Sequence, residues 1–217
     1  MKKLAVGIIM TSILFSHLPV LKKLVEASKK KKHTFIDPAQ PFSPLSEKEL
    51  KTIRNSKIDY AIELTHEQAL IRAAEISGKS IKQLKRECRA PDKIVSLATS
   101  CSWVEKKLTL SVNSYSVPLI VIVKLCRNGS LGWINTLQKP LLLELSARDK
   151  LFSGVIEVDL VANGFCYLVN GHLYLKENVV GTGALEAASA STAAYSVSET
   201  SDYIGECYTG SKWVKLL

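Results

Sequence analysis

Three Asn-Gly dipeptides in the C-terminal half of the chain constrain its fold more than any other feature. They stand at Asn128-Gly129, Asn163-Gly164 and Asn170-Gly171. Both residue types accept the positive φ that a type I′ turn requires, so an Asn-Gly pair between apolar runs is the strongest short indication of a β-hairpin. Three such pairs predict an antiparallel meander.

The segments around these turns have the period of two that is typical of β-strands. Residues 107–113 alternate apolar and polar side chains, and residues 117–125 are apolar and β-branched, as in a central strand. Residues 185–197, rich in Ala and Ser, predict one or two flat strands. The other expected strands are residues 141–145, 154–162, 165–169, 172–177, 203–208 and 212–217, with the last two separated by a turn at Thr209-Gly210-Ser211. This pattern favours an antiparallel β-sandwich over residues 94–217, with a barrel as the alternative.

Residues 45–93 have a helical pattern instead. Three capping boxes mark three short helices: Ser46 with Glu49, Thr65 with Gln68, and Ser80 with Gln83. Gly78 offers the left-handed conformation that ends the second helix. The expected fold class is therefore α+β, mainly β, with short helices ahead of the sandwich.

The first 27 residues resemble a removable signal peptide in their order of charge and hydropathy. A Lys pair precedes a mostly apolar run at residues 4–21, and the segment that ends at Ala27 has the small and aliphatic residues of a cleavage site. Cleavage after Ala27 leaves Ser28 as the first mature residue and predicts a secreted, extracellular protein. The alternatives are a membrane anchor formed by residues 4–21, or a core helix of a cytoplasmic protein.

Basic residues are concentrated in the first half of the 217-residue chain. The net charge is +9, and residues 1–107 hold 21 Lys+Arg against 11 Asp+Glu, whereas residues 108–217 hold 8 against 9. Residues 28–44 form an expected extended, proline-containing tail with four consecutive lysines, Lys29, Lys30, Lys31 and Lys32. These lysines are the expected contact with an anionic cell-surface polymer or membrane.

Five cysteines are too few for a disulfide-dense miniprotein, and their spacing lacks the C-x₂-C pairs of zinc or redox sites. Two disulfides are expected among four cysteines that fall in or beside predicted strands, with the pairing left open. These are Cys101, Cys126, Cys166 and Cys207. Cys88, at the end of a predicted helix, is the expected odd one.

Motifs of known chemistry are few. No nucleophile elbow, phosphate-binding glycine loop or metal-ligand spacing occurs, so no catalytic residue, metal or cofactor is predicted. Glu157 and Asp159, two apart on one expected strand, face the same side, as in some hydrolases but more often as solvated residues of a sheet. Residues 73–84 resemble a helix-turn-helix, which would bring Lys82, Lys85 and Arg86 near phosphates.

Five aromatic residues can form either a carbohydrate platform or part of the core. They are Trp103, Trp133, Trp213, Tyr167 and Tyr174, and the core interpretation is preferred. The expected function is a secreted, non-enzymatic binding or surface-interaction protein with a protein or carbohydrate ligand. The alternatives are a secreted toxin or antimicrobial factor, a secreted hydrolase whose carboxylates converge on the β domain, and, least favoured, a DNA-binding protein.

Overall fold

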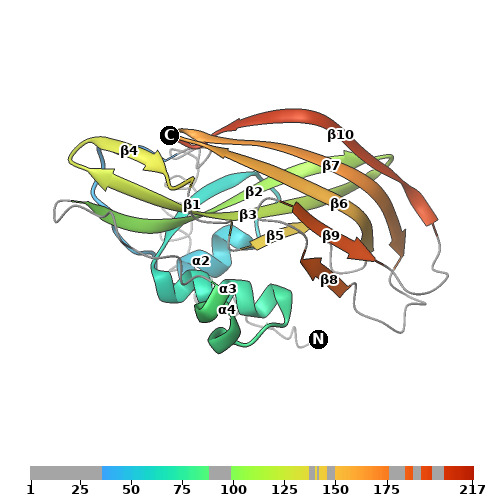
Figure 1. The fold of residues 1–217 in the computed structure, drawn as a ribbon, viewed down its shortest axis with the longest axis horizontal. Coiled ribbons are helices and arrows are strands. Elements are labelled where there is room, and N and C mark those ends of the chain that lie inside the picture. The colour runs from blue at the N-terminus through green and yellow to red at the C-terminus, as the bar shows by residue number, and fades with distance from the viewer. Residues whose placement is uncertain are drawn as a thin grey trace, which may run out of the picture. The chain divides into compact units, whose positions relative to one another are not determined.

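The computed structural model of the chain describes residues 36–87, 99–136, 140, 142–145, 150–175, 184–187, 192–196 and 203–217. These residues form three helices and ten strands (Figure 1). The helices are α2 (Glu47–Arg54), α3 (His66–Ser77) and α4 (Ile81–Glu87). The predicted signal peptide with its Ala27–Ser28 cleavage site, the lysines at 29–32 and Cys88 lie outside the described residues.

All three predicted capping boxes are present. The backbone N–H groups of Ser46, Thr65 and Ser80 donate to the side chains three residues further on, at 2.9, 3.0 and 2.9 Å. Gly78 ends α3 with φ 67°, a left-handed conformation that glycine adopts without steric cost. Local capping chemistry therefore sets where these helices begin and end.

Sheet A contains five antiparallel strands in the order β1-β2-β3-β4, with β5 also pairing with β3. Its centre is the long β2–β3 hairpin, in which Leu110 lies opposite Val117. Its strands are β1 (Tyr60–Leu64), β2 (Ser100–Val112), β3 (Tyr115–Asn128), β4 (Leu131–Ile134) and β5 (Leu142–Leu145). The turn predicted at Asn128-Gly129 lies one residue later, at Gly129 and Ser130, because Asn128 still pairs with Leu131 as the last residue of β3. It joins β3 to β4, and Gly129 has φ 59°.

Sheet B contains five antiparallel strands in the order β10-β7-β6-β9-β8. Figure 1 shows β6, β7 and β10 running side by side. The strands are β6 (Lys150–Val161), β7 (Gly164–Leu175), β8 (Ala184–Ala187), β9 (Thr192–Ser196) and β10 (Tyr203–Lys215). The β6–β7 hairpin turns at Ala162 and Asn163, next to the predicted Asn163-Gly164 position.

Two predicted turns are wrong, since the chain continues as a strand through both. Asn170-Gly171 lies inside β7, where Gly171 is opposite Gly154, and a Cβ on Gly171 would collide with the backbone oxygen of Ser153. The absence of a side chain at Gly171 therefore allows β6 to approach β7 closely, and this glycine does not form a turn. Residues 209–211 lie inside β10, where a register shift between Thr209 and Lys212 absorbs the irregular sequence as a bulge.

A further strand, β1, was not predicted. It lies between α2 and α3, within the region predicted as helical, and pairs with β2 so that Ala61 is opposite Lys106. Four of its five residues are buried, hence it lacks the alternation by which strands are predicted.

Buried apolar side chains form two clusters on opposite faces of sheet A. Val104 and Val121 belong to a cluster that also contains Ile156, Val169 and other residues of sheet B. Their strand neighbours Trp103 and Ile122 belong to a second cluster, in which Leu50, Leu70 and Leu84 supply one buried leucine from each helix. Both faces of the central hairpin are therefore buried, one with sheet B and one with the helices.

A hydrogen bond joins the first described residue to the end of the last strand segment. The backbone N–H of Ile36 donates to the carbonyl of Leu216 at 2.6 Å, and the N–H of Leu216 donates to Asn163 at 2.9 Å. Pro38 lies against Gly132 in β4. The segment that enters the fold is thus fixed beside the strand that ends it.

Candidate binding face

Alternation along β6, β7 and β10 separates core side chains from outward ones. Ile156, Phe165, Cys207 and Val214 are buried in the core, so their strand neighbours point to the other side of sheet B. We call this side the sheet B outer face. It includes Glu157, Asp159, Cys166, Asn170, His172, Tyr174, Tyr203, Glu206, Tyr208 and Trp213.

Strand β10 supplies three large aromatic side chains to this face, although it is an edge strand. Tyr203, Tyr208 and Trp213 are 57%, 67% and 52% exposed. A tryptophan or tyrosine left this accessible keeps an apolar ring and a polar group available to a ligand. The three lie along one strand and therefore form a line at the rim of the sheet.

The neighbouring strands place polar side chains in register with these rings. Trp213 lies opposite Cys166, and Cys166 lies opposite Asp159 on the far side of β7. Tyr208 lies opposite Asn170. Since adjacent strands are about 4.8 Å apart, Trp213 and Asp159 are separated by about 10 Å across the face.

Ring contacts hold one end of the face in place. The ring of Tyr203 lies 5.7 Å from that of His172 and 5.9 Å from that of Tyr174, the latter in an edge-on arrangement. Edge-on pairs are favoured by the charge distribution of aromatic rings. These contacts limit the conformations of Tyr203 before any ligand arrives.

Glu157 and Asp159 are both exposed, while Ile156 and Val158 between and beside them are fully buried. This is the arrangement expected of the solvated side of a strand. The two carboxylates are therefore open acceptors for hydrogen bonds on the sheet B outer face.

Of the five aromatic residues predicted to form either a carbohydrate platform or part of the core, some lie in the core and others on the surface. Trp103 is buried, and its Nε1–H donates to Nδ1 of His66 at 3.0 Å, while Tyr167 lies in the core. Trp133 is half-buried on β4 of sheet A. Only Trp213 and Tyr174 lie on the sheet B outer face.

Sequence reasoning missed Tyr203 and Tyr208 on this face. Glu206 and Tyr208 alternate with the buried Cys207, which is a pattern that could have identified their outward direction. Splitting β10 into two strands at residues 209–211 concealed that Tyr208 and Trp213 share one strand.

One of the two predicted disulfides is present. Cys101 and Cys126 lie directly opposite each other on β2 and β3 and are bonded. Cys166 and Cys207 are free thiols. The second bridge does not form between them because Cys207 is level with Gly171, five residues along β7 from Cys166, whereas a disulfide needs Cα atoms within about 7 Å. Burial raises the pKa of the Cys207 thiol to about 11.

A buried ionic cluster joins α2 and α3 to sheet A. The carboxylate of Glu105 is fully buried and accepts hydrogen bonds from Arg54 Nη2 and Tyr60 Oη, each at 2.7 Å. Arg72 Nε lies 3.5 Å from the same carboxylate. Burial and the neighbouring Glu105 charge raise the pKa of Tyr60 far above its ordinary value. The Glu105 carboxylate thus ties α2, through Arg54, and α3, through Arg72, to sheet A.

A second ion pair lies at the end of sheet A next to the disulfide. Arg127 Nη2 donates to Glu63 Oε2 at 2.7 Å, Arg127 Nη1 donates to Glu63 Oε1, and Ser102 Oγ donates to Glu63 Oε1 at 2.6 Å. The two-point contact fixes β1 against β3 across β2.

The two helices of the predicted helix-turn-helix, α3 and α4, are present on either side of Gly78. Lys82, Lys85 and Arg86 are exposed on α4, and Leu84 is buried beneath them.

In the described part of the chain, no group of three or more His, Cys, Asp or Glu residues is arranged to hold a metal ion. None of the helices described is long and apolar enough to cross a membrane. Comparison of the chain with protein-family models, curated proteins and solved structures finds no match.

Proposed function

We propose that this protein is secreted and non-enzymatic, and that it binds a carbohydrate polymer on the sheet B outer face. The observation that carries the proposal is the line of exposed rings on β10, with Tyr208 and Trp213 more than half exposed. Exposing an apolar ring to water is unfavourable. A group of exposed aromatic residues on a rigid surface is therefore typical of a binding site.

The polar side chains on this face favour a hydroxyl-rich ligand. Aromatic rings pack on the C–H faces of a sugar, while carboxylate and amide oxygens accept hydrogen bonds from its hydroxyl groups. Asn170 lies beside Tyr208, and Asp159 lies in the row of Trp213. The exposure of Glu157 and Asp159 on the open face of a sheet favours this binding role over the hydrolase alternative, in which catalytic carboxylates converge in a cleft.

Export and sandwich packing belong to the same proposal. We take residues 1–27 as the signal peptide and the two sheets as the layers of a β-sandwich over residues 94–217. The Cys101–Cys126 bridge supports an oxidising compartment, because disulfides are rare in reducing cytosol. The core shared by Val104 and Ile156 supports the packing of sheet on sheet.

Sedimentation with insoluble polysaccharides tests the binding proposal. Chitin, cellulose and peptidoglycan are incubated with the purified protein, and affinity is then measured by calorimetry with soluble oligosaccharides of the polymer that binds. We expect Tyr208→Ala and Trp213→Ala each to weaken binding about tenfold, a typical cost of removing an aromatic anchor. Leu131→Ala is the matched control, since Leu131 is 71% exposed but lies on β4 of sheet A.

Two results would contradict the proposal. One is the absence of binding to all three polymers, and the other is unchanged binding by the Tyr208→Ala/Trp213→Ala double variant. Thermal unfolding of each variant shows whether a loss of binding reflects the face or the fold. The intact mass of the protein in the culture medium tests export separately, because cleavage after Ala27 gives a chain that starts at Ser28.

A further inference from the structure

Helix α4 exposes three cationic side chains. Lys85 and Arg86 follow Lys82 by three and four residues, so each starts from a position next to Lys82 on the helix surface. All three are exposed, whereas Leu84 is 2% exposed and packs in the cluster under the helices. The buried leucine thus fixes which side of α4 faces outward.

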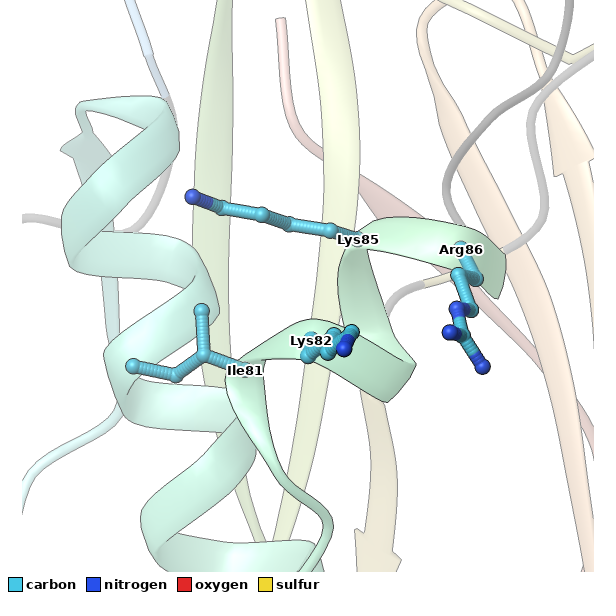
Figure 2. Close-up of a pocket in the computed structure, with 4 residues that line it drawn as sticks. All are labelled: Ile81, Lys82, Lys85 and Arg86. Atoms are coloured by element: carbon cyan, nitrogen blue, oxygen red, sulfur yellow. The ribbon is translucent and has the colours of Figure 1, made fainter.

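These side chains line a hollow of about 510 Å³ together with Ile81 (Figure 2). Ile81 is 41% exposed, although isoleucine side chains are usually buried. The described lining therefore combines three positive charges with one accessible apolar side chain, and it includes no acidic residue.

Figure 2 shows that the three charged groups point in different directions. Lys85 and Arg86 extend to opposite sides of α4, and Lys82 projects from the helix between them. A single phosphate is bound by donors that converge on one point. Diverging cations instead fit a surface that carries many separate anions.

We propose that α4 docks on the surface of a bilayer rich in anionic phospholipids. The three cations are complementary in charge to anionic lipid headgroups. The exposed Ile81 favours a bilayer over a soluble polyanion, because only the bilayer has an apolar layer beneath its charged surface. Glu75, an exposed acid of α3, is paired with Arg72 at 3.6 Å. The positive balance of residues 28–107, with 17 Lys+Arg against 10 Asp+Glu, adds a long-range attraction of the same sign.

The partition of the protein between water and lipid vesicles tests the proposal. The chain that starts at Ser28 is mixed with vesicles of phosphatidylcholine alone and with vesicles that contain phosphatidylglycerol, at physiological salt. The ratio of the two partition coefficients isolates the part of binding that depends on lipid charge. Since each cation near an anionic leaflet strengthens binding about fivefold, we expect Lys82→Gln/Lys85→Gln/Arg86→Gln to lower this ratio about 100-fold. Glutamine keeps the helix, because its helix propensity is close to that of lysine.

A second triple variant, which removes the same charge from another helix, is the control for the α4 variant. Lys48, Lys51 and Lys57 are exposed and lie on or next to α2. Replacing all three by glutamine removes the same net charge, and we expect the ratio to fall less than tenfold. Ile81→Ser is expected to lower the partition coefficient on the anionic vesicles several-fold while leaving binding to heparin unchanged.

Three outcomes would overturn the proposal. They are an unchanged ratio in the α4 variant, an equal fall in both triple variants, and tighter binding to duplex DNA than to the anionic vesicles. Polysaccharide binding by the α4 variant is expected to match that of the wild type, so failure of this proposal is separable from failure of the carbohydrate proposal.

Discussion

Replacing Glu105 by glutamine tests whether the buried ionic cluster holds the helices on sheet A. The substitution keeps the size of the side chain but removes its charge. Arg54 and Arg72 then remain 15% and 19% exposed without the carboxylate that each contacts. Breaking a buried pair by removing one partner typically costs 3–5 kcal/mol, since the remaining charge has lost its compensation.

The lower end of that range applies because both arginines retain some contact with water. We therefore expect Glu105→Gln to lower the free energy of unfolding by about 3 kcal/mol. For a chain of this length, that corresponds to a fall in Tm of about 6 to 12 °C. Urea unfolding followed by circular dichroism measures the first quantity, and calorimetry measures the second.

Glu75→Gln is the matched control, because Glu75 contacts the same Arg72 from the surface. It lies 3.6 Å from Arg72, and its side chain is 56% exposed. An exposed pair at this spacing contributes about 0.5 kcal/mol or less. Salt at 1 M screens the Glu75 contribution but leaves most of the Glu105 contribution, which is not in contact with solvent. A Glu105→Gln variant as stable as Glu75→Gln would refute this reasoning.

Two further predictions concern the cysteines. Replacing Cys101 and Cys126 by serine is expected to cost about 3.5 kcal/mol in urea unfolding, the loop-entropy value for a separation of 25 residues, and a double variant as stable as the oxidised wild type would contradict it. For Cys207, the folded-state pKa of about 11 exceeds the ordinary value of 9.0, so its stabilisation is full below about pH 9 and is lost as pH rises toward 11. Urea unfolding between pH 8 and 11 should show a smaller decline for Cys207→Ala than for the wild type, and parallel curves would exclude the effect.

The parts of the fold that depend on neighbouring residues could be predicted from the sequence. The capping box at Thr65 and Gln68 and the turn between β3 and β4, found one residue after its predicted position, are each fixed by contacts within a few residues. The paired strands in the Ala- and Ser-rich segment, β8 and β9, also agree with the prediction. In each case the chemistry that sets the conformation lies inside the segment itself.

Features that depend on distant partners could not be predicted. Gly171 has the local sequence of a turn but lies in a strand because Gly154 and Ser153 approach it closely. Glu105 contacts Arg54, 51 residues away, and no spacing rule relates the two. The candidate site has the same difficulty, since Trp103 and Trp213 both lie in strands, and only the packing around each decides that one is buried and the other exposed.

The hydrogen bond between Ile36 and Leu216 makes the described fold nearly a closed ring. In a chain shortened to residues 36–217, a linker between the two ends would span only a few ångströms. Circular permutation, with the chain reopened at the exposed turn of Gly129 and Ser130, is therefore compatible with every strand pairing of both sheets and removes only the covalent connection between β3 and β4.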